Sequence, residues 1–139
     1  MNQNYDDQIT ELLQKMTLKE KIGQLNMTTT PRTEEAFEKT RERLRKGEIG
    51  SIILASSDTA GNDPLERVNS AMCNRMQKVA IEEGPHGIPL IYGRDIIHGH
   101  TTIYPVPLAM AAAFNDELVK EAYRYTAIEA SATGVHWTF

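Results

Sequence analysis

Apolar positions along the chain follow two different patterns. In residues 18–25 and 64–83, apolar side chains recur every three or four positions, which predicts helices with one apolar face. Two continuous apolar runs interrupt this pattern, GSIILA at residues 50–55 and GIPLIYG at residues 87–93. Runs of this kind are typical of strands that are buried on both faces of a parallel sheet. The pattern therefore predicts an α/β protein.

Capping signals locate two helices before the first apolar run. Thr17 and Glu20 have the spacing of a capping box, so a helix is expected to start at about Thr17. A second helix is expected from Thr33 to Gly47, because acidic residues fill its first turn and basic residues fill its last. That order of charges is the one that the helix dipole favours.

The second half of the chain repeats the pattern. Helices are expected from Pro64 to Glu83 and from Asn115 to Gly134, and VHWTF at residues 135–139 is interpreted as a third strand. Strands that alternate with helices form parallel sheets with right-handed crossovers. Because the sequence ends within the third strand, residues 1–139 are expected to be an incomplete domain. We expect the N-terminal segment of a (β/α)8 TIM-type barrel, truncated after about the third strand.

Composition and charge narrow the class of protein. The 139 residues carry a formal net charge of -4, which disfavours nucleic acid and anionic membranes as partners. No segment reaches the length of a membrane span, and the N-terminus lacks the pattern of a signal peptide. From this sequence alone we expect a cytoplasmic protein. If a leader was removed, we expect a secreted or periplasmic one. Cys73, the single cysteine, is expected to be a small buried residue.

Candidate binding residues cluster in GRDIIHGH at residues 93–100. In parallel α/β folds, ligand-binding residues lie at the carboxyl ends of strands, and Arg94 and Asp95 occupy that place after the second apolar run. A carboxylate there can accept hydrogen bonds from two sugar hydroxyls, and Arg94 would keep it ionised. The alternative is an ion pair between Arg94 and Asp95 that only holds down the loop. These residues alone do not decide between the two interpretations.

The histidines and the tryptophan also allow two interpretations each. His98 and His100 have an H-x-H spacing, but a catalytic zinc site needs a third ligand, so we expect no metal and two histidines that brace the loop by hydrogen bonds. His136 is expected to be a buried, hydrogen-bonded residue. Trp137 is expected to fill the core, with stacking on a sugar as the alternative. Residues 93–99 lack the glycine pattern of a nucleotide-binding loop, so no cofactor is predicted.

Four blocks of the chain resemble, in order, the N-terminal part of the family 3 glycoside hydrolases in their β-glucosidase branch. The blocks are MTLKEKIGQL (residues 16–25), GSIIL (50–54), GIPLIYGRDIIHGHTTIYPVPLAMAAAFN (87–115) and EASATGVHWTF (129–139). The resemblance implies a (β/α)8-type barrel domain that binds the non-reducing sugar of a β-glucoside. It also implies that Asp95 binds the hydroxyls of that sugar, with Arg94 and His98 as neighbouring candidates.

The resemblance further implies a retaining mechanism with an aspartate nucleophile and a separate carboxylic acid. Both groups are expected beyond Phe139, so no catalytic residue is predicted within the chain, and residues 1–139 alone are expected to be inactive. DIIHGH departs from the acidic-Gly-Gly stretch of the N-acetylhexosaminide-cleaving branch, which favours terminal β-D-glucosyl or xylosyl residues as substrate. The expected partners are a β-glucoside or oligosaccharide and the remainder of the barrel. The alternative function is a non-catalytic sugar-binding or assembly module, complete at 139 residues, that forms a homo-oligomer.

Overall fold

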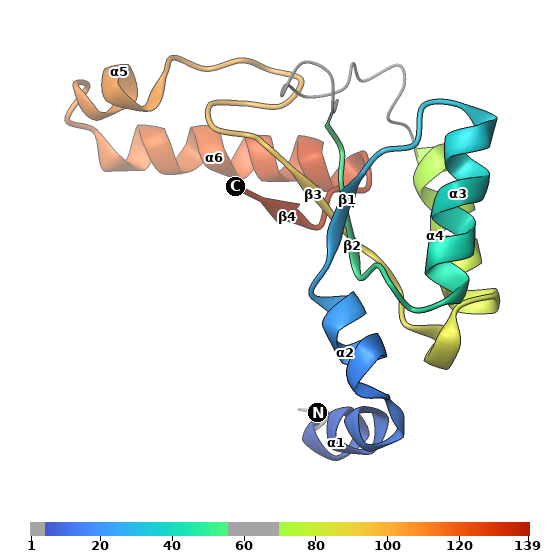
Figure 1. The fold of residues 1–139 in the computed structure, drawn as a ribbon. Coiled ribbons are helices and arrows are strands. Elements are labelled where there is room, and N and C mark those ends of the chain that lie inside the picture. Colours follow the sequence, from blue (N-terminus) through green and yellow to red (C-terminus); the bar gives the residue numbers. More distant parts are fainter. Residues whose placement is uncertain (1–4, 56–69) are drawn as a thin grey trace. The chain divides into compact units, whose positions relative to one another are not determined.

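The computed structural model describes residues 5–55 and 70–139 (Figure 1). The chain divides into two compact units, one of Met1–Ile52 with Arg75–Leu90 and one of Ile53–Asn74 with Ile91–Phe139. The elements in chain order are α1 (Asp6–Lys15), α2 (Leu18–Gln24), β1 (Met27–Thr29), α3 (Glu34–Arg45), β2 (Ser51–Ile53), α4 (Ser70–Glu82), the 3-10 helix η1 (Pro85–Gly87), β3 (Ile91–Arg94), α5 (Pro107–Ala111), α6 (Asp116–Ala132) and β4 (Trp137–Thr138).

The described strands form one four-stranded sheet in the order β1-β2-β3-β4. β3 and β4 pair in parallel, with Gly93 opposite Trp137 and Arg94 opposite Thr138. A doubly wound sheet reverses its strand order at a switch point, whereas a barrel adds each strand next to the preceding one. The observed order is that of a barrel, so the predicted class, an α/β fold that forms part of a (β/α)8 barrel, is confirmed.

The described sheet contains one strand more than the three that the sequence pattern predicts. The additional strand is β1, whose sequence Met-Thr-Thr has no apolar run. The pattern also does not predict α1 or α5. The helix predicted from Pro64 to Glu83 is present from Ser70 to Glu82, and residues 64–69 lie outside the described residues. None of the described helices combines the length and the apolar character that crossing a membrane requires.

Helix ends lie where local capping predicts them. At α2, the Thr17 hydroxyl accepts a hydrogen bond from the Glu20 backbone, and the Glu20 carboxylate accepts one from the Thr17 backbone N–H at 2.7 Å. At α3, the Thr33 hydroxyl accepts a hydrogen bond from the Ala36 backbone N–H at 3.1 Å. Gly47, with a φ of 67°, follows the last turn of α3. These ends are predictable because capping involves residues within one turn of each other.

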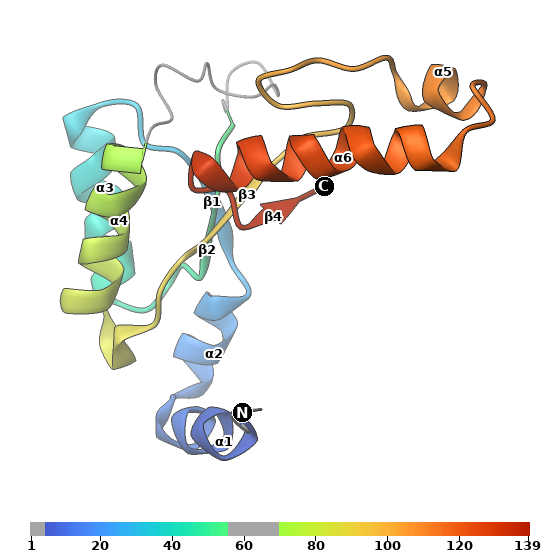
Figure 2. The same cartoon turned by 180° about the vertical axis from the view of Figure 1, so that it is seen from behind.

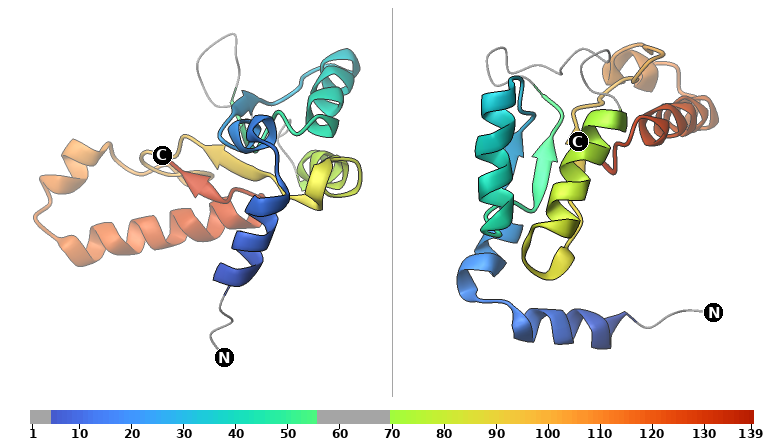
Figure 3. Two further views of the ribbon diagram at one scale, coloured as in Figure 1. Left: turned by 60° about the horizontal axis from the view of Figure 1, so that its bottom comes forward. Right: turned by 90° about the vertical axis from the view of Figure 1, so that its right-hand side faces the viewer.

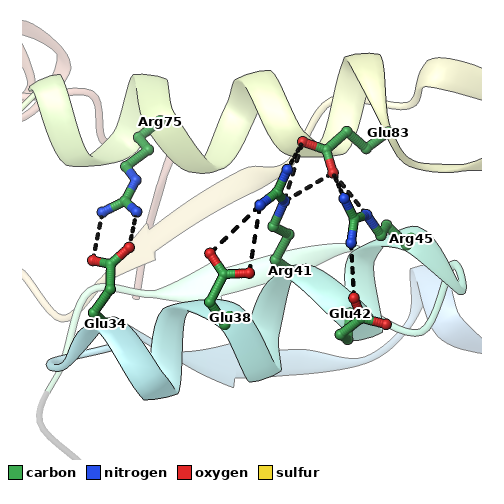
Figure 4. Close-up of polar contacts among 7 residues, drawn as sticks. All are labelled: Glu34, Glu38, Arg41, Glu42, Arg45, Arg75 and Glu83. Carbon is green, nitrogen blue, oxygen red and sulfur yellow. Dashed lines mark hydrogen bonds and ion pairs between the residues drawn. The ribbon is translucent and has the colours of Figure 1, made fainter.

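In the first unit, α3 and the part of α4 that starts at Arg75 run side by side in the same direction (Figure 3). Arginine–glutamate contacts join the two helices (Figure 4). The Glu83 carboxylate accepts hydrogen bonds from Arg41 Nη2 at 2.8 Å and Arg45 Nε at 2.7 Å, and Arg75 forms an ion pair with Glu34. The hydrogen bonds, first from Arg41 and then from Arg45, lower the pKa of Glu83. These contacts fix how far α4 is shifted along α3.

In the second unit, the C-terminal half of α6 lies beside β3 and β4, and its N-terminal half extends toward α5 (Figure 2). The core of this unit contains Tyr92 of β3, which is 1% exposed. Its hydroxyl donates a hydrogen bond to the carbonyl of Cys73 at 2.8 Å, so the one polar group of this side chain is satisfied. Cys73 is buried as predicted, and burial raises the pKa of its thiol.

α6 begins and ends where the sequence predicts. The Asn115 side chain accepts a hydrogen bond from the Leu118 backbone N–H at 3.0 Å, which caps the first turn. Gly134 follows the helix with a φ of 88°, a conformation that residues with a Cβ rarely adopt. The chain then turns directly into β4.

Candidate functional site

β3 is paired on both sides up to its carboxyl end. On one side, the backbone N–H of Leu54 donates to the carbonyl of Gly93 at 2.8 Å. On the other side, the backbone N–H of Phe139 donates to the carbonyl of Arg94 at 3.3 Å. Because both neighbours hold the strand, Asp95 leaves the sheet at a fixed place.

The two predicted candidates at this strand end differ in burial. Arg94 is 5% exposed, and its Nη1 atom donates to the carbonyl of Leu54 at 3.5 Å. Asp95, the next residue, is exposed. The strand therefore ends with a guanidinium inside the protein and a carboxylate at its surface.

The loop that follows Asp95 is attached to α6 by a carboxylate. Glu129 Oε2 accepts hydrogen bonds from the backbone N–H groups of Thr101 and Thr102, each at 2.9 Å. Glu129 Oε1 accepts a third hydrogen bond from the Thr102 hydroxyl at 2.6 Å. One side chain thus satisfies two consecutive backbone donors and a hydroxyl at the tip of the loop.

Both histidines of the loop form hydrogen bonds that brace it, as predicted. His98 Nδ1 donates to the carbonyl of Tyr104 at 2.9 Å, and the Tyr104 backbone N–H donates to the carbonyl of His98 at 2.7 Å. His100 Nε2 lies 2.8 Å from the Thr133 hydroxyl. The Thr133 hydroxyl donates its proton to the carbonyl of Ala130 at 2.8 Å, so His100 Nε2 is the donor in that contact. Within residues 5–55 and 70–139, no three His, Cys, Asp or Glu side chains are grouped as metal ligands.

The surroundings of His100 and Glu129 set the protonation states of these two side chains at neutral pH. Burial, and then the positive charge of Arg94, lower the pKa of His100 below its ordinary value of 6.5. The hydroxyl and then the backbone N–H of Thr102 lower the pKa of Glu129. At pH 7 the loop is therefore held by a neutral imidazole and an ionised carboxylate.

Two predictions for the last strand are wrong. His136 is exposed rather than buried, although its Nδ1 atom accepts a hydrogen bond from the Tyr92 backbone N–H at 3.3 Å. Trp137 is 49% exposed rather than part of the core, and its ring lies edge-on to Phe139 with centroids 5.0 Å apart. Alternation along a strand shows which residues share a face. It does not show whether another element covers that face.

A cavity of about 360 Å³ lies beside the loop, on the side of α6. Its lining comes from the start of the loop, the middle of α6 and the end of β4, namely Ile96, Ile97, Tyr123, Thr126, Ala127, Thr138 and Phe139. Asp95 is not among the lining residues. The candidate carboxylate thus lies at the strand end, outside this cavity.

Sequence reasoning missed the residues of α6 and of its C-cap that hold the loop. Besides Glu129 and Thr133, Tyr123 donates its hydroxyl proton to the carbonyl of Ile97 at 2.8 Å. A signal was available, because Tyr123, Thr126, Glu129 and Thr133 follow one another at helical spacings of three and four residues. A polar stripe on a helix that also has a buried face indicates polar contacts with a neighbouring segment.

A sheet wound in chain order, with polar side chains and a braced loop at the carboxyl end of a strand, defines part of a (β/α)8-type barrel of the kind that binds ligands at that end. The chain belongs to glycosyl hydrolase family 3, since residues 17–139 match the N-terminal domain of that family.

Individual relatives agree with this assignment. A periplasmic β-glucosidase of Salmonella typhimurium is 31% identical over 131 residues, which cover 94% of this chain and 15% of the relative. A lysosomal β-glucosidase of Dictyostelium discoideum is 33% identical over 151 residues, which cover 96% of this chain and 18% of the relative. A mutant β-glucosidase of Listeria innocua, solved in complex with laminaribiose, superposes with a TM-score of 0.74 at 26% identity, over 96% of this chain and 18% of that one. The chain therefore spans less than a fifth of the length of these relatives.

Proposed function

We propose that this chain supplies the first strands of the catalytic barrel, and part of the sugar-binding subsite, of a retaining glycoside hydrolase. The substrate is a terminal, non-reducing β-D-glucosyl or xylosyl residue of an oligosaccharide or other glycoside. The names of the relatives, which are β-glucosidases, support this class of reaction. The Salmonella relative is named as periplasmic, which favours the secreted alternative for the location of the protein over the cytoplasmic one.

The observation that carries the proposal is the exposed carboxylate of Asp95 at the carboxyl end of β3. A sugar presents adjacent hydroxyl donors, and a carboxylate accepts two of them at once. Arg94 and His98 have supporting roles, because Arg94 lies buried beneath the site and His98 closes the turn of the loop through Tyr104. The nucleophile and the acid/base group are assigned to polypeptide outside residues 1–139, and no metal or organic cofactor is proposed.

The test is the substitution Asp95→Ala in the full-length gene product, assayed with p-nitrophenyl β-D-glucopyranoside. Two hydrogen bonds to a charged group contribute about 1.5–3 kcal/mol each, so kcat/KM is expected to fall by about 10²-fold to 10⁴-fold. The free energy of unfolding should change by less than about 0.5 kcal/mol, because the side chain is exposed.

The matched control is Asp116→Asn, which removes an exposed carboxylate from the first turn of α6 and should leave kcat/KM unchanged. An Asp95→Ala protein that loses stability but keeps its turnover would show that Asp95 is only the structural partner of Arg94. The proposed subsite role would then be wrong.

A further inference from the structure

Glu129 combines three contacts on a single loop. Its two oxygens accept hydrogen bonds from the backbone N–H groups of Thr101 and Thr102 and from the Thr102 hydroxyl, at 2.6–2.9 Å. The residue is part-buried on α6, 27 and 28 positions further along the chain than the loop residues that it binds. A glutamate that only made the surface of α6 polar would not need these three hydrogen bonds.

The loop that Glu129 holds leads directly from the candidate sugar ligand. Thr101 lies only six residues after Asp95. Ile96, between them, is 4% exposed and anchors the start of the loop in the core. Burial, and then the positive charge of Arg94, lower the pKa of His100, the residue before Thr101. A short segment, with the buried Ile96 after Asp95 and the buried His100 before Thr101, therefore connects the loop tip to both residues at the end of β3.

We infer that Glu129 is a positioning residue, which fixes the loop after β3 and thereby holds the Asp95 carboxylate in the geometry that binds the sugar. This inference rests on the proposed function and adds a residue to it. A displacement of about 1 Å in a reacting or binding group can lower the rate about 10²-fold, so the effect of losing this anchor is measurable in turnover.

The experiment compares Glu129→Ala with Glu129→Gln in the full-length gene product, using p-nitrophenyl β-D-glucopyranoside. Glutamine can keep the geometry, because its amide oxygen accepts from the two backbone N–H groups while its amide nitrogen donates to the Thr102 hydroxyl. We expect kcat/KM to fall by about 10-fold to 100-fold for the alanine variant and by less than about 5-fold for the glutamine variant. The control Glu121→Ala, on the same helix but paired with Arg124, should have no effect.

A double-mutant cycle separates positioning from general structural support. If Glu129 acts through Asp95, Glu129→Ala costs little in an Asp95→Ala background, because the group that it positions is already absent. Thr102→Val, which removes one of the three hydrogen bonds, should show the same pattern with a smaller, few-fold effect and should be rescued by Thr102→Ser. This milder series decides the question even if Glu129→Ala does not fold.

The outcomes distinguish this inference from the proposed function. Equal losses from Glu129→Ala, or from Thr102→Val, in both backgrounds would overturn the positioning role while leaving Asp95 as the sugar ligand. An Asp95→Ala protein with unchanged kcat/KM would instead refute the proposed function itself. Losses that vanish in the Asp95→Ala background support both the proposed function and the positioning role of Glu129.

Discussion

The close approach at Gly99 allows a quantitative test of how the loop is built. Gly99 has a φ of 126° and forms an antiparallel bridge with Ile103. A Cβ atom at this position would lie 2.1 Å from the carbonyl oxygen of Thr102 and 2.9 Å from the Cα atom of Ile103. Both are backbone atoms, so they cannot rotate away as a side chain would. Gly99→Ala is therefore expected to open the turn rather than to strain it.

The size of the effect follows from two contributions. The backbone conformation alone costs a residue with a Cβ about 1–3 kcal/mol, and the contact with the Thr102 carbonyl adds to that cost. If the loop opens locally, hydrogen exchange at the Thr101 and Thr102 amides should accelerate by at least about 5-fold to 150-fold, since each 1.4 kcal/mol is a factor of ten. Amide exchange measured by NMR or mass spectrometry reports this directly, in the full-length gene product.

Gly134→Ala is the matched control, because it shares the positive φ but not the clash. Gly134 has a φ of 88°, and the nearest atom to an added Cβ is Cys73 Sγ at 3.7 Å, an ordinary van der Waals distance. This variant should lose only about 1–2 kcal/mol of unfolding free energy and keep the loop amides protected. If Gly99→Ala leaves exchange at Thr101 and Thr102 unchanged, or if Gly134→Ala accelerates it as much, the argument from the close approach is wrong.

Three further predictions concern one buried hydrogen bond and two titratable side chains. Tyr92→Phe should lower the free energy of unfolding by about 1 kcal/mol in urea denaturation, because it removes a buried hydrogen bond to Cys73, whereas Tyr125→Phe, at a 48% exposed site, should change it by less than about 0.5 kcal/mol. The folded state lowers the pKa of His100, so the contribution of the neutral imidazole to stability is fully present above pH 6.5 and is lost as the pH falls toward the folded pKa. His100→Gln should therefore reduce the change in melting temperature between pH 7.5 and pH 5. Equal changes in the variant and the parent protein would contradict this. Because the folded state lowers the pKa of Glu83, the contribution of its carboxylate to stability is present above pH 4.5 and is lost as the pH falls toward the folded pKa. Glu83→Gln should therefore weaken the dependence of stability on acid pH. An unchanged acid transition would show that the pairing of Glu83 with α3 contributes nothing to stability.

Features that depend only on residues close together in the sequence were predictable. The capping box of Thr17 and Glu20 and the buried character of β2 and β3 are properties of short segments, and the structure confirms them. β1 was not predictable in this way, because Met-Thr-Thr has neither alternation nor an apolar run. It forms a strand through its place in the sheet, next to β2. Tertiary context often overrides weak local preference in short strands.

The candidate site was predictable in position but not in its supporting contacts. Asp95 could be located because it follows directly after a recognisable buried strand, and residues there face the end of the sheet where ligands bind. The contact of Glu129 with Thr102 could not be derived, because the two residues are 27 positions apart and their approach depends on the path of a long loop. The exposure of Trp137 could not be derived either, since its burial depends on which element covers that face of β4.

Besides the hydrogen bonds between His98 and Tyr104 within the loop, the loop after β3 is held by α6, the helix that follows it in the chain, and by the C-cap residue Thr133. Strand end, loop and bracing helix therefore belong to one βαβ segment within the second unit, residues 91–139. It follows that stability and site geometry can be perturbed separately. Glu83→Gln, in the contacts between α3 and α4, should lower stability without accelerating exchange at the Thr102 amide. Glu129→Ala should accelerate that exchange even where the overall melting temperature changes little. If both substitutions affected the loop equally, the loop would depend on the whole fold, and the positioning role would have to be assigned to the fold rather than to α6.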